Sequence, residues 1–414
     1  MKLSIRQWLR ISIISFLIVS ILGVLMRYKI PFSLPALHQK HLLHAHSHFA
    51  FTGWITQTLY VLLLYFLQKQ LNGVLNRRYR FLLIGNLIAC YGMLFSFTAQ
   101  GYGIISISFA TLSIIINYAF AFTYCRDLKK MPSHASKPWL KASLFFSVLS
   151  SLGTFYLAYM MYSRSVDQNQ YLGSLYFFLH FQYNGWFSFA AMGLLIAWFR
   201  NLLPDVKISP LVFQLSFWAC IPAYLLSTLW ANLPPWLYVL TVFAAVAQFA
   251  GWTIFLKQLA GFWQRLKPMV SKTGGLILML AAFAFTIKLL LQLGSTIPAV
   301  SKLAFGFRPI VIAYLHLILL AVFSLFLLSY SFENGFLQRN KTTIAGLAII
   351  AAGVFLNEFV LLVQGVAAFS YTSIPYVNEI LLGVAFTIMM GILVLLFSQF
   401  SKNDNAVLTS GRQT

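Results

Sequence analysis

Three histidines lie inside long apolar stretches of the sequence and are the residues best suited to chemistry. They are His48, His180 and His316. A histidine within a membrane segment usually faces the protein interior, a cavity or a cofactor, and neutral imidazole is a common ligand of iron, copper and zinc. The three histidines therefore predict metal ligation. The alternative is that each one forms a hydrogen bond to a neighbouring helix.

The segments that begin at these histidines resemble one another. Residues 48–56 read HFAFTGWIT and residues 180–188 read HFQYNGWFS, so both have His-Phe, an aromatic residue at the third following position, and Gly-Trp at the fifth and sixth. Residues 316–324 read HLILLAVFS, which keeps the histidine, a small residue at the fifth position and a Phe-Ser pair. The pattern predicts an internal repeat that places the three histidines in one membrane layer.

The first of these segments is preceded by more histidines. His44 and His48 share one helix face because an α-helix has about 3.6 residues per turn, whereas His46 points to roughly the opposite side. One helix could thus serve two sites. His38 and His41 are interpreted as interfacial residues in contact with water. The candidate metal ligands are His44, His46, His48, His180 and His316.

The composition requires lipid as the main solvent. Of the 414 residues, 60% are hydrophobic and 9% are charged, so the chain cannot present an ordinary water-facing surface. Twelve apolar runs are long enough to cross a bilayer as helices. We expect an all-α integral membrane fold of twelve transmembrane helices, built as three pseudo-repeated four-helix units. The units are roughly 1–135, 136–270 and 271–402, all within a single polytopic domain over 1–402, followed by a polar cytoplasmic tail over 403–414.

The charge distribution sets the expected orientation. The formal net charge is +22, but the Lys and Arg residues fall in alternate short loops, as orientation signals do. This places both termini in the cytoplasm, most simply of a bacterial inner membrane, and argues against nucleic-acid binding. The cysteines Cys90, Cys125 and Cys220 are scattered, without metal-binding spacing, and imply no disulfide framework.

Two short stretches resemble a known family. The segment His46-Ser47-His48-Phe49-Ala50-Phe51-Thr52-Gly53 is similar to the His-x-His-x-Ala-x-x-Gly signature of the heme-copper oxidase superfamily, and most of all to its nitric oxide reductase branch. The segment His180-x-x-x-Asn184-Gly185 resembles the sixth-helix His-x-x-x-Glu-Gly motif of that branch. The resemblance implies a b-type heme, a second metal (copper or iron), and action on, or sensing of, O2 or NO. Electrons would come from a donor protein or from quinol.

The sequence also departs from that family. The seventh helix of the family supplies an adjacent His-His pair, but the run Leu211 to Ala231 has no histidine. Tyr314 stands where the family has the ligand of the high-spin heme, and the His-x-His signature has moved to the second helix. The resemblance therefore does not imply a standard dinuclear centre.

The resemblance implies a set of ligands because the low-spin heme of the family bridges helices two and ten. His48 and His316 are the preferred pair, and His180 would hold a second metal with His46 or His44. Trp54, Trp186 and the small Gly53 would suit a flat macrocycle, since glycine lets a ring approach the backbone. The alternative is that Gly-Trp only packs helices.

A carboxylate within an apolar run is the other candidate for chemistry. Glu358 could relay protons or support a metal, and Tyr314 is a second candidate catalytic residue. Glu358 could equally form a salt bridge with Lys288, or Lys288 could extend outward to the interface.

Two other functional classes compete with the heme hypothesis. A zinc-dependent membrane hydrolase would use three histidines and Glu358 as base, although the sequence has no His-Glu-x-x-His motif. A secondary transporter is suggested by the number of helices and the basic loop at residues 72–78, but it would more naturally show two six-helix halves.

Overall fold

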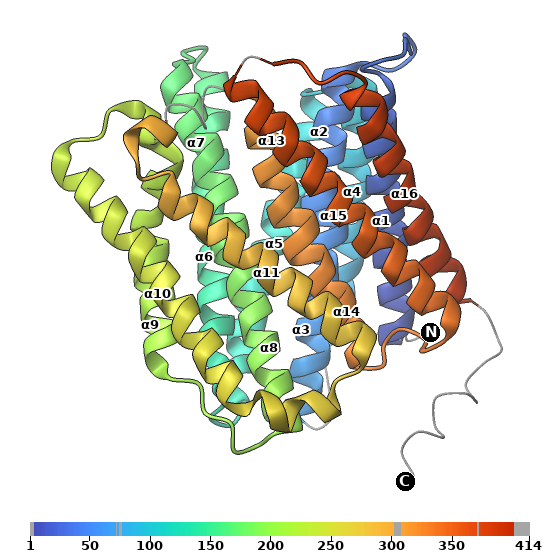
Figure 1. The fold of residues 1–414 in the computed structure, drawn as a ribbon, viewed down its shortest axis with the longest axis vertical. Helices are drawn as coiled ribbons and strands as arrows, with labels where there is room; N and C mark the ends of the chain where they lie inside the picture. Colours follow the sequence, from blue (N-terminus) through green and yellow to red (C-terminus); the bar gives the residue numbers. More distant parts are fainter. Residues whose placement is uncertain (1–3, 72, 74–76, 302–307, 371, 401–414) are drawn as a thin grey trace.

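A computed structural model describes residues 4–71, 73, 77–301, 308–370 and 372–400. The predicted tail 403–414 lies outside this part of the chain. Every regular element among the described residues is a helix, and the helices form one bundle in which most run along a common axis (Figure 1). The prediction of an all-helical protein is confirmed.

Eleven helices are long and apolar enough to cross a membrane, so the prediction of an integral membrane protein is also confirmed. Large apolar side chains cover the outside of the bundle, for example Phe81 and Phe122, each 72% exposed, as is expected of a surface that contacts lipid. The eleven spans are Ile5–Tyr28, Gln39–Gln70, Arg78–Gln100, Ile104–Lys130, Lys137–Tyr162, Pro210–Ala231, Pro235–Met269, Lys272–Gly294, Pro309–Glu333, Lys341–Ala368 and Val377–Ser398.

The twelfth expected span is helical but more polar. Residues 168–202 form a helix that includes Gln168, Gln170 and Gln182 and is not among the eleven. A division into twelve helices and three units therefore stays a prediction.

Three of the long helices change to π-helical geometry part-way along. In a π-helix the backbone hydrogen bonds join residues five apart, and such segments are rare and frequent at functional sites. The three composite helices are α2 (Gln39–Phe49), η1 (Ala50–Thr56) and α3 (Gln57–Gln70); α7 (Gln168–His180), η2 (Phe181–Phe187) and α8 (Ser188–Leu202); and α13 (Arg308–His316), η5 (Leu317–Ser324) and α14 (Leu325–Glu333).

The expected seventh helix, Leu211 to Ala231, is interrupted. It consists of α9 (Pro210–Cys220) and the 3-10 helix η3 (Pro222–Ala231). Proline has no backbone N–H and its ring clashes with the preceding turn of an α-helix, which explains why α9 ends just before Pro222. The segment therefore changes its hydrogen-bonding pattern within the bundle.

The first and last long helices are neighbours. α1 (Ile5–Tyr28) packs against α16 (Val377–Ser398), which Figure 1 shows at one side of the bundle. The Arg6 guanidinium donates to Gly335 O at 3.1 Å, beside the start of α15 (Lys341–Phe369), and the Arg10 guanidinium lies 5.0 Å from the centroid of the Phe400 ring. The start of α1 and the end of α16 therefore lie at the same end of the bundle.

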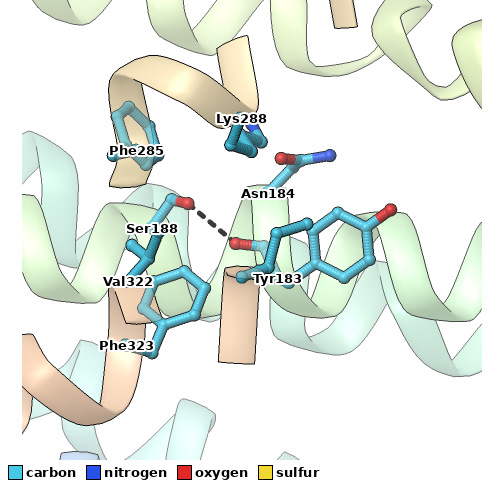
Figure 2. Close-up of a pocket in the computed structure, with 8 residues that line it drawn as sticks. Tyr183, Asn184, Ser188, Phe285, Lys288, Val322 and Phe323 are labelled. Atoms are coloured by element: carbon cyan, nitrogen blue, oxygen red, sulfur yellow. Dashed lines mark hydrogen bonds between the residues drawn. The ribbon is translucent and has the colours of Figure 1, made fainter. Parts of the chain in front are cut away.

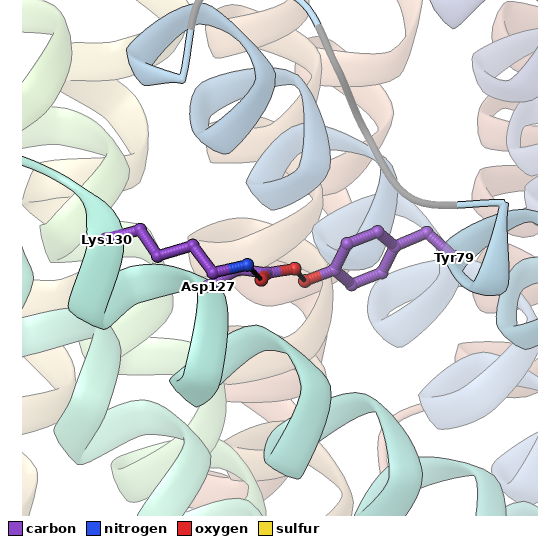
Figure 3. A network of polar contacts seen from close by, with 3 residues as sticks. All are labelled: Tyr79, Asp127 and Lys130. Atoms are coloured by element: carbon purple, nitrogen blue, oxygen red, sulfur yellow. Dashed lines mark hydrogen bonds and ion pairs between the residues drawn. The ribbon is translucent and has the colours of Figure 1, made fainter.

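Polar contacts near the same end join α4 (Arg78–Gln100) to α5 (Ile104–Lys130). The Tyr79 hydroxyl donates to Asp127 Oδ2 at 2.7 Å, and Lys130 Nζ donates to Asp127 Oδ1 at 2.7 Å (Figure 3). Asp127 is buried, and with both oxygens bonded its carboxylate fastens the two helices together.

The N-terminus of α11 (Lys272–Gly294) is capped by a buried carboxylate. Glu333, the last residue of α14, accepts hydrogen bonds from Ser271 N and from the Ser271 hydroxyl, and Ser271 Oγ accepts from Gly274 N at 3.0 Å. A negative charge there complements the helix dipole. A Cβ at Gly274 would collide with Glu333 Oε1, so this close approach requires glycine.

Candidate functional site

Each histidine of the predicted repeat is followed at once by a π-helical segment. η1 begins two residues after His48, whereas η2 and η5 begin directly after His180 and His316. Within the described residues, no other π-helix occurs. The three segments of the predicted repeat thus share a rare backbone geometry. This observation supports the repeat, and it does not depend on the residue types from which the repeat was predicted.

Two tryptophans of the repeat link neighbouring π-helical segments. Trp54 of η1 donates from Nε1 to Ser324 Oγ of η5 at 2.8 Å, and Trp186 of η2 donates from Nε1 to Thr56 Oγ1 of η1 at 3.4 Å. In both cases a residue six positions after one histidine bonds to a residue eight positions after another. The four side chains are buried, so these tryptophans serve packing between the repeated helices.

The third possible link of this kind is missing. The residue six positions after His316 is Val322, which has no donor, and the matching hydroxyl belongs to Ser188. Both line a narrow pocket, in which the Ser188 hydroxyl donates to Tyr183 O at 2.7 Å (Figure 2). The side chains close this pocket so far that no water molecule fits. It is lined by Tyr183, Asn184, Ser188, Phe285, Lys288, Ile318, Val322 and Phe323.

Two buried polar groups face this pocket. Lys288 of α11 is 3% exposed, and it has no carboxylate partner among the residues that the structure describes. Asn184 is 5% exposed, and its Oδ1 has no hydrogen-bond partner within the described ranges. Figure 2 shows the two side chains close together at one side of the pocket.

Both ring nitrogens of His180 are engaged within the protein. His180 is fully buried; its Nε2–H donates to Cys220 O at 2.8 Å, and its Nδ1 lies 3.0 Å from Asn184 Nδ2, which donates to it. A metal would have to displace one of these partners. The contacts therefore fit the alternative reading, in which this histidine bonds a neighbouring helix.

The interruption at Pro222 explains the first of these bonds. In a continued α-helix, Tyr224 N would bond to Cys220 O, but here it bonds to Ile221 O at 3.2 Å. The Cys220 carbonyl thus has an acceptor site for the imidazole of His180, which satisfies a buried backbone group.

His46 and His316 show a different pattern. Nδ1–H of His46 donates to Val19 O at 3.0 Å, and Nδ1–H of His316 donates to Ile312 O at 2.8 Å. Both imidazoles lie within electrostatic range of each other and of Arg27. Nε2 of each carries the free lone pair and has no hydrogen-bond partner in the described part of the chain. Metal-bound histidines commonly donate their second N–H to a backbone carbonyl in this way.

His48 lies on the other face of α2. Its ring stacks on Phe97 with centroids 4.4 Å apart, and its Nε2 is 3.2 Å from the Tyr102 hydroxyl. The His44 ring lies 4.6 Å from the Tyr102 ring. No described contact joins His48 to His316, whereas His46 lies within electrostatic range of His316, so the expected pairing of His48 with His316 stays a prediction.

Aromatic side chains pack directly against the two glycines of the repeat, Gly53 and Gly185. A Cβ at Gly53 would lie 2.8 Å from the Phe49 ring, and a Cβ at Gly185 would collide with Phe146. Because these glycines have no side chain, phenylalanine rings can contact the backbone there. Such packing is the alternative to contact between the glycines and a macrocycle.

Glu358 and Tyr314, the predicted catalytic residues, are not brought together with the histidines by any described contact. Glu358 of α15 accepts from Asn357 Nδ2 at 3.0 Å and forms no salt bridge with Lys288. The Tyr314 ring packs 6.3 Å from that of Tyr183. Glu379 lies in the first turn of α16, where a carboxylate favours the helix dipole.

No three His, Cys, Asp or Glu side chains within the described ranges are placed to hold one metal ion. His46 and His316 could still hold a heme, because axial ligation of its iron needs only two imidazoles.

Comparison with known proteins identifies the fold. No protein-family model and no curated protein matches the sequence. Among solved structures, the chain is similar to one from a heme-copper terminal oxidase dimer studied by cryo-EM, with a TM-score of 0.66 and 13% identity over 96% of this chain and 82% of that chain. The protein has a heme-copper oxidase fold. At this level of identity the likeness establishes the oxidase fold alone.

Sequence reasoning missed three features of this oxidase-fold site. Arg27 lies near His46 and His316, Cys220 accepts from His180 through its backbone, and Tyr102 reaches His48 from the turn after α4. Only Cys220 had a signal in the sequence, namely the proline two residues later.

Proposed function

We propose that this protein binds a b-type heme through His46 and His316 and acts as an oxidoreductase-like protein or a sensor for a small diatomic molecule, O2 or NO. The observation that carries the proposal is that both histidines donate Nδ1–H to a backbone carbonyl and keep Nε2 available. This arrangement fixes the tautomer that an iron ligand needs.

The surrounding residues fit such a group. Arg27 is within electrostatic range of both histidines, and a guanidinium is suited to a heme carboxylate. Gly23 of α1 lies beside His46, since a Cβ there would be 3.5 Å from His46 Cε1. When bound, a heme would supply one-electron redox chemistry and a site for O2 or NO.

The two histidines differ in how they are held. His46 is anchored to Val19 on a different helix, whereas His316 bonds to Ile312 one turn back in its own helix. We therefore assign His46 as the more firmly held of the two residues that would hold the heme and His316 as the less firmly held one. Electrons would come from a donor protein or from quinol.

The residues do not fit the second metal, copper or iron, that the family resemblance implied. His180 would have to lose Cys220 O or Asn184 as a partner. A second metal is therefore not part of the proposed function. We further propose that the protein lies in a bacterial inner membrane with both termini in the cytoplasm.

Absorption spectra of the purified protein, oxidised and reduced, test the heme assignment. We expect a Soret band and reduced α and β bands that are lost in His46→Ala and His316→Ala but kept in His48→Ala, the matched control on the same helix. Adding CO to the reduced protein tests for an exchangeable position. Wild-type protein without a Soret band after heme supplementation would refute the proposal, and loss of heme in His48→Ala alone would restore His48 as the ligand.

A further inference from the structure

Four histidines form a row along one side of α2 that does not contribute to the proposed heme site. Three of them lie within the helix at spacings of three and four residues, which places their side chains on one face. The fourth is the N-cap residue, whose backbone is extended. His46 points away from the row, toward α1. The members of this histidine row are His38, His41, His44 and His48.

One turn between α4 and α5 orients three members of the row. Gly101 has φ +66°, and a Cβ there would lie 2.7 Å from His41 Nε2. The next residue, Tyr102, packs its ring against His44 and brings its hydroxyl to within 3.2 Å of His48 Nε2. The row is therefore held by a second segment of the chain.

The outer members of the row have ring nitrogens available. His38 is exposed, and its ring centroid lies 4.5 Å from that of His41. Nε2 of His44 is buried and has no hydrogen-bond partner in the described part of the chain. A buried polar atom without a partner needs an explanation, such as an ion or a water molecule.

We propose that the histidine row binds a divalent transition-metal ion, with Cu²⁺ bound most tightly, and that the ion enters at His38 and His41 and moves to His44 and His48. Two histidines one turn apart on a helix can ligate one metal ion, and imidazole favours Cu²⁺ over other first-row divalent ions. Since each step uses two imidazoles, water completes the coordination and the ion stays exchangeable.

This proposal is independent of the heme assignment because it uses the opposite face of α2. Cu²⁺ titration of purified full-length protein, without a histidine tag, tests it by calorimetry and by electron paramagnetic resonance. We expect saturable binding, nitrogen hyperfine coupling from imidazole, and affinity reduced by roughly ten-fold or more in His41→Ala and His44→Ala. His134→Gln, in a loop at the other end of the bundle, should bind Cu²⁺ as the wild type does.

The polar variants His41→Asn and His44→Gln keep the experiment decisive if the alanine variants fold poorly. Thermal unfolding of each variant checks its folding before titration. Equal Cu²⁺ affinity in wild-type protein and in the folded His41→Asn/His44→Gln double variant would overturn the proposal, as would an equal loss of affinity in His134→Gln.

Discussion

The indole of Trp54 bonds to the hydroxyl of Ser324, although the two residues are far apart in the sequence. Trp186 bonds to Thr56 by the same rule of positions six and eight after a histidine. The hydrogen bonds thus run in one direction around the centre of the bundle, from η2 to η1 and from η1 to η5.

Removal of the Trp54 donor tests this link. Trp54→Phe should lower the free energy of unfolding by about 1–2 kcal/mol, because Ser324 loses a buried hydrogen bond and some packing is lost. A double-mutant cycle with Ser324→Ala should give a coupling energy of about 1 kcal/mol. Trp218→Phe is the control, since Trp218 is 69% exposed on the outside of the bundle. A coupling energy near zero would contradict the proposed energetic role of the bond.

Lys288→Met tests the cost of the buried ammonium group. The Lys288 amine has no carboxylate partner in the described part of the chain and lies 5.1 Å from the centroid of the Phe285 ring. Burial of an amine that no carboxylate balances is unfavourable, so an apolar side chain of similar length should raise the free energy of unfolding by about 1–3 kcal/mol. Lys257→Met, at an exposed position of α10 (Pro235–Leu266), should have little effect. A lower melting temperature for Lys288→Met would show that Lys288 makes a favourable interaction.

His180→Phe separates a structural histidine from a metal ligand. The substitution removes the bonds to Cys220 O and Asn184 and should cost about 2–4 kcal/mol of stability, because buried partners are left unsatisfied. Heme content per folded protein, measured as the pyridine hemochrome, should stay at the wild-type level. Loss of heme from folded His180→Phe protein would make His180 a ligand again.

Gly274→Ala should destabilise the cap of α11. The added Cβ collides with Glu333 Oε1, so the carboxylate must move away from Ser271, at a cost of about 1–3 kcal/mol. The shorter side chain in Glu333→Ala should make the same glycine substitution less harmful. Thermal unfolding of the two single variants and the double variant measures this, and strictly additive losses would argue against the collision.

A partly buried imidazole outside the membrane spans should make the stability of the protein depend on pH. His134 lies in the loop between α5 and α6 (Lys137–Tyr162), where burial, followed by the charge of Arg200, lowers the pKa of its imidazole. The unfolded chain then binds a proton more readily than the folded protein does, so the free energy of unfolding should fall as the pH falls below about 6.5. His134→Gln should reduce this pH dependence in chemical unfolding measured between pH 7.5 and 5.5, whereas an unchanged slope would assign it to other groups.

Composition and the apolar runs were sufficient to predict an all-helical membrane protein, and the resemblance of two short motifs predicted the heme-copper oxidase fold. The repeat could be read from Trp54, Trp186 and the hydroxyl residues that follow because side-chain packing preserves those positions. The π-helical segments could not be predicted, because apolar periodicity carries no signal for one extra residue per turn.

The choice between His46 and His48 also exceeded what the sequence could decide. Helical periodicity places them on opposite faces of one helix, but the rotation of that helix within the bundle depends on contacts with α1 and α4. The partner that shows His180 to be engaged within the protein is the backbone carbonyl of Cys220. Because every residue has a backbone carbonyl, the residue type gives no signal for such a partner.

The contact between α1 and α16 makes the order of the helices partly arbitrary. Since the two helices pack side by side and the Arg6 guanidinium reaches Gly335 O, the bundle closes on itself around its centre. A circular permutant that starts at Lys137, with the original ends joined by a flexible linker, would keep every inter-helix contact described above. The fold therefore depends on the closed arrangement of the helices more than on the place where synthesis of the chain begins.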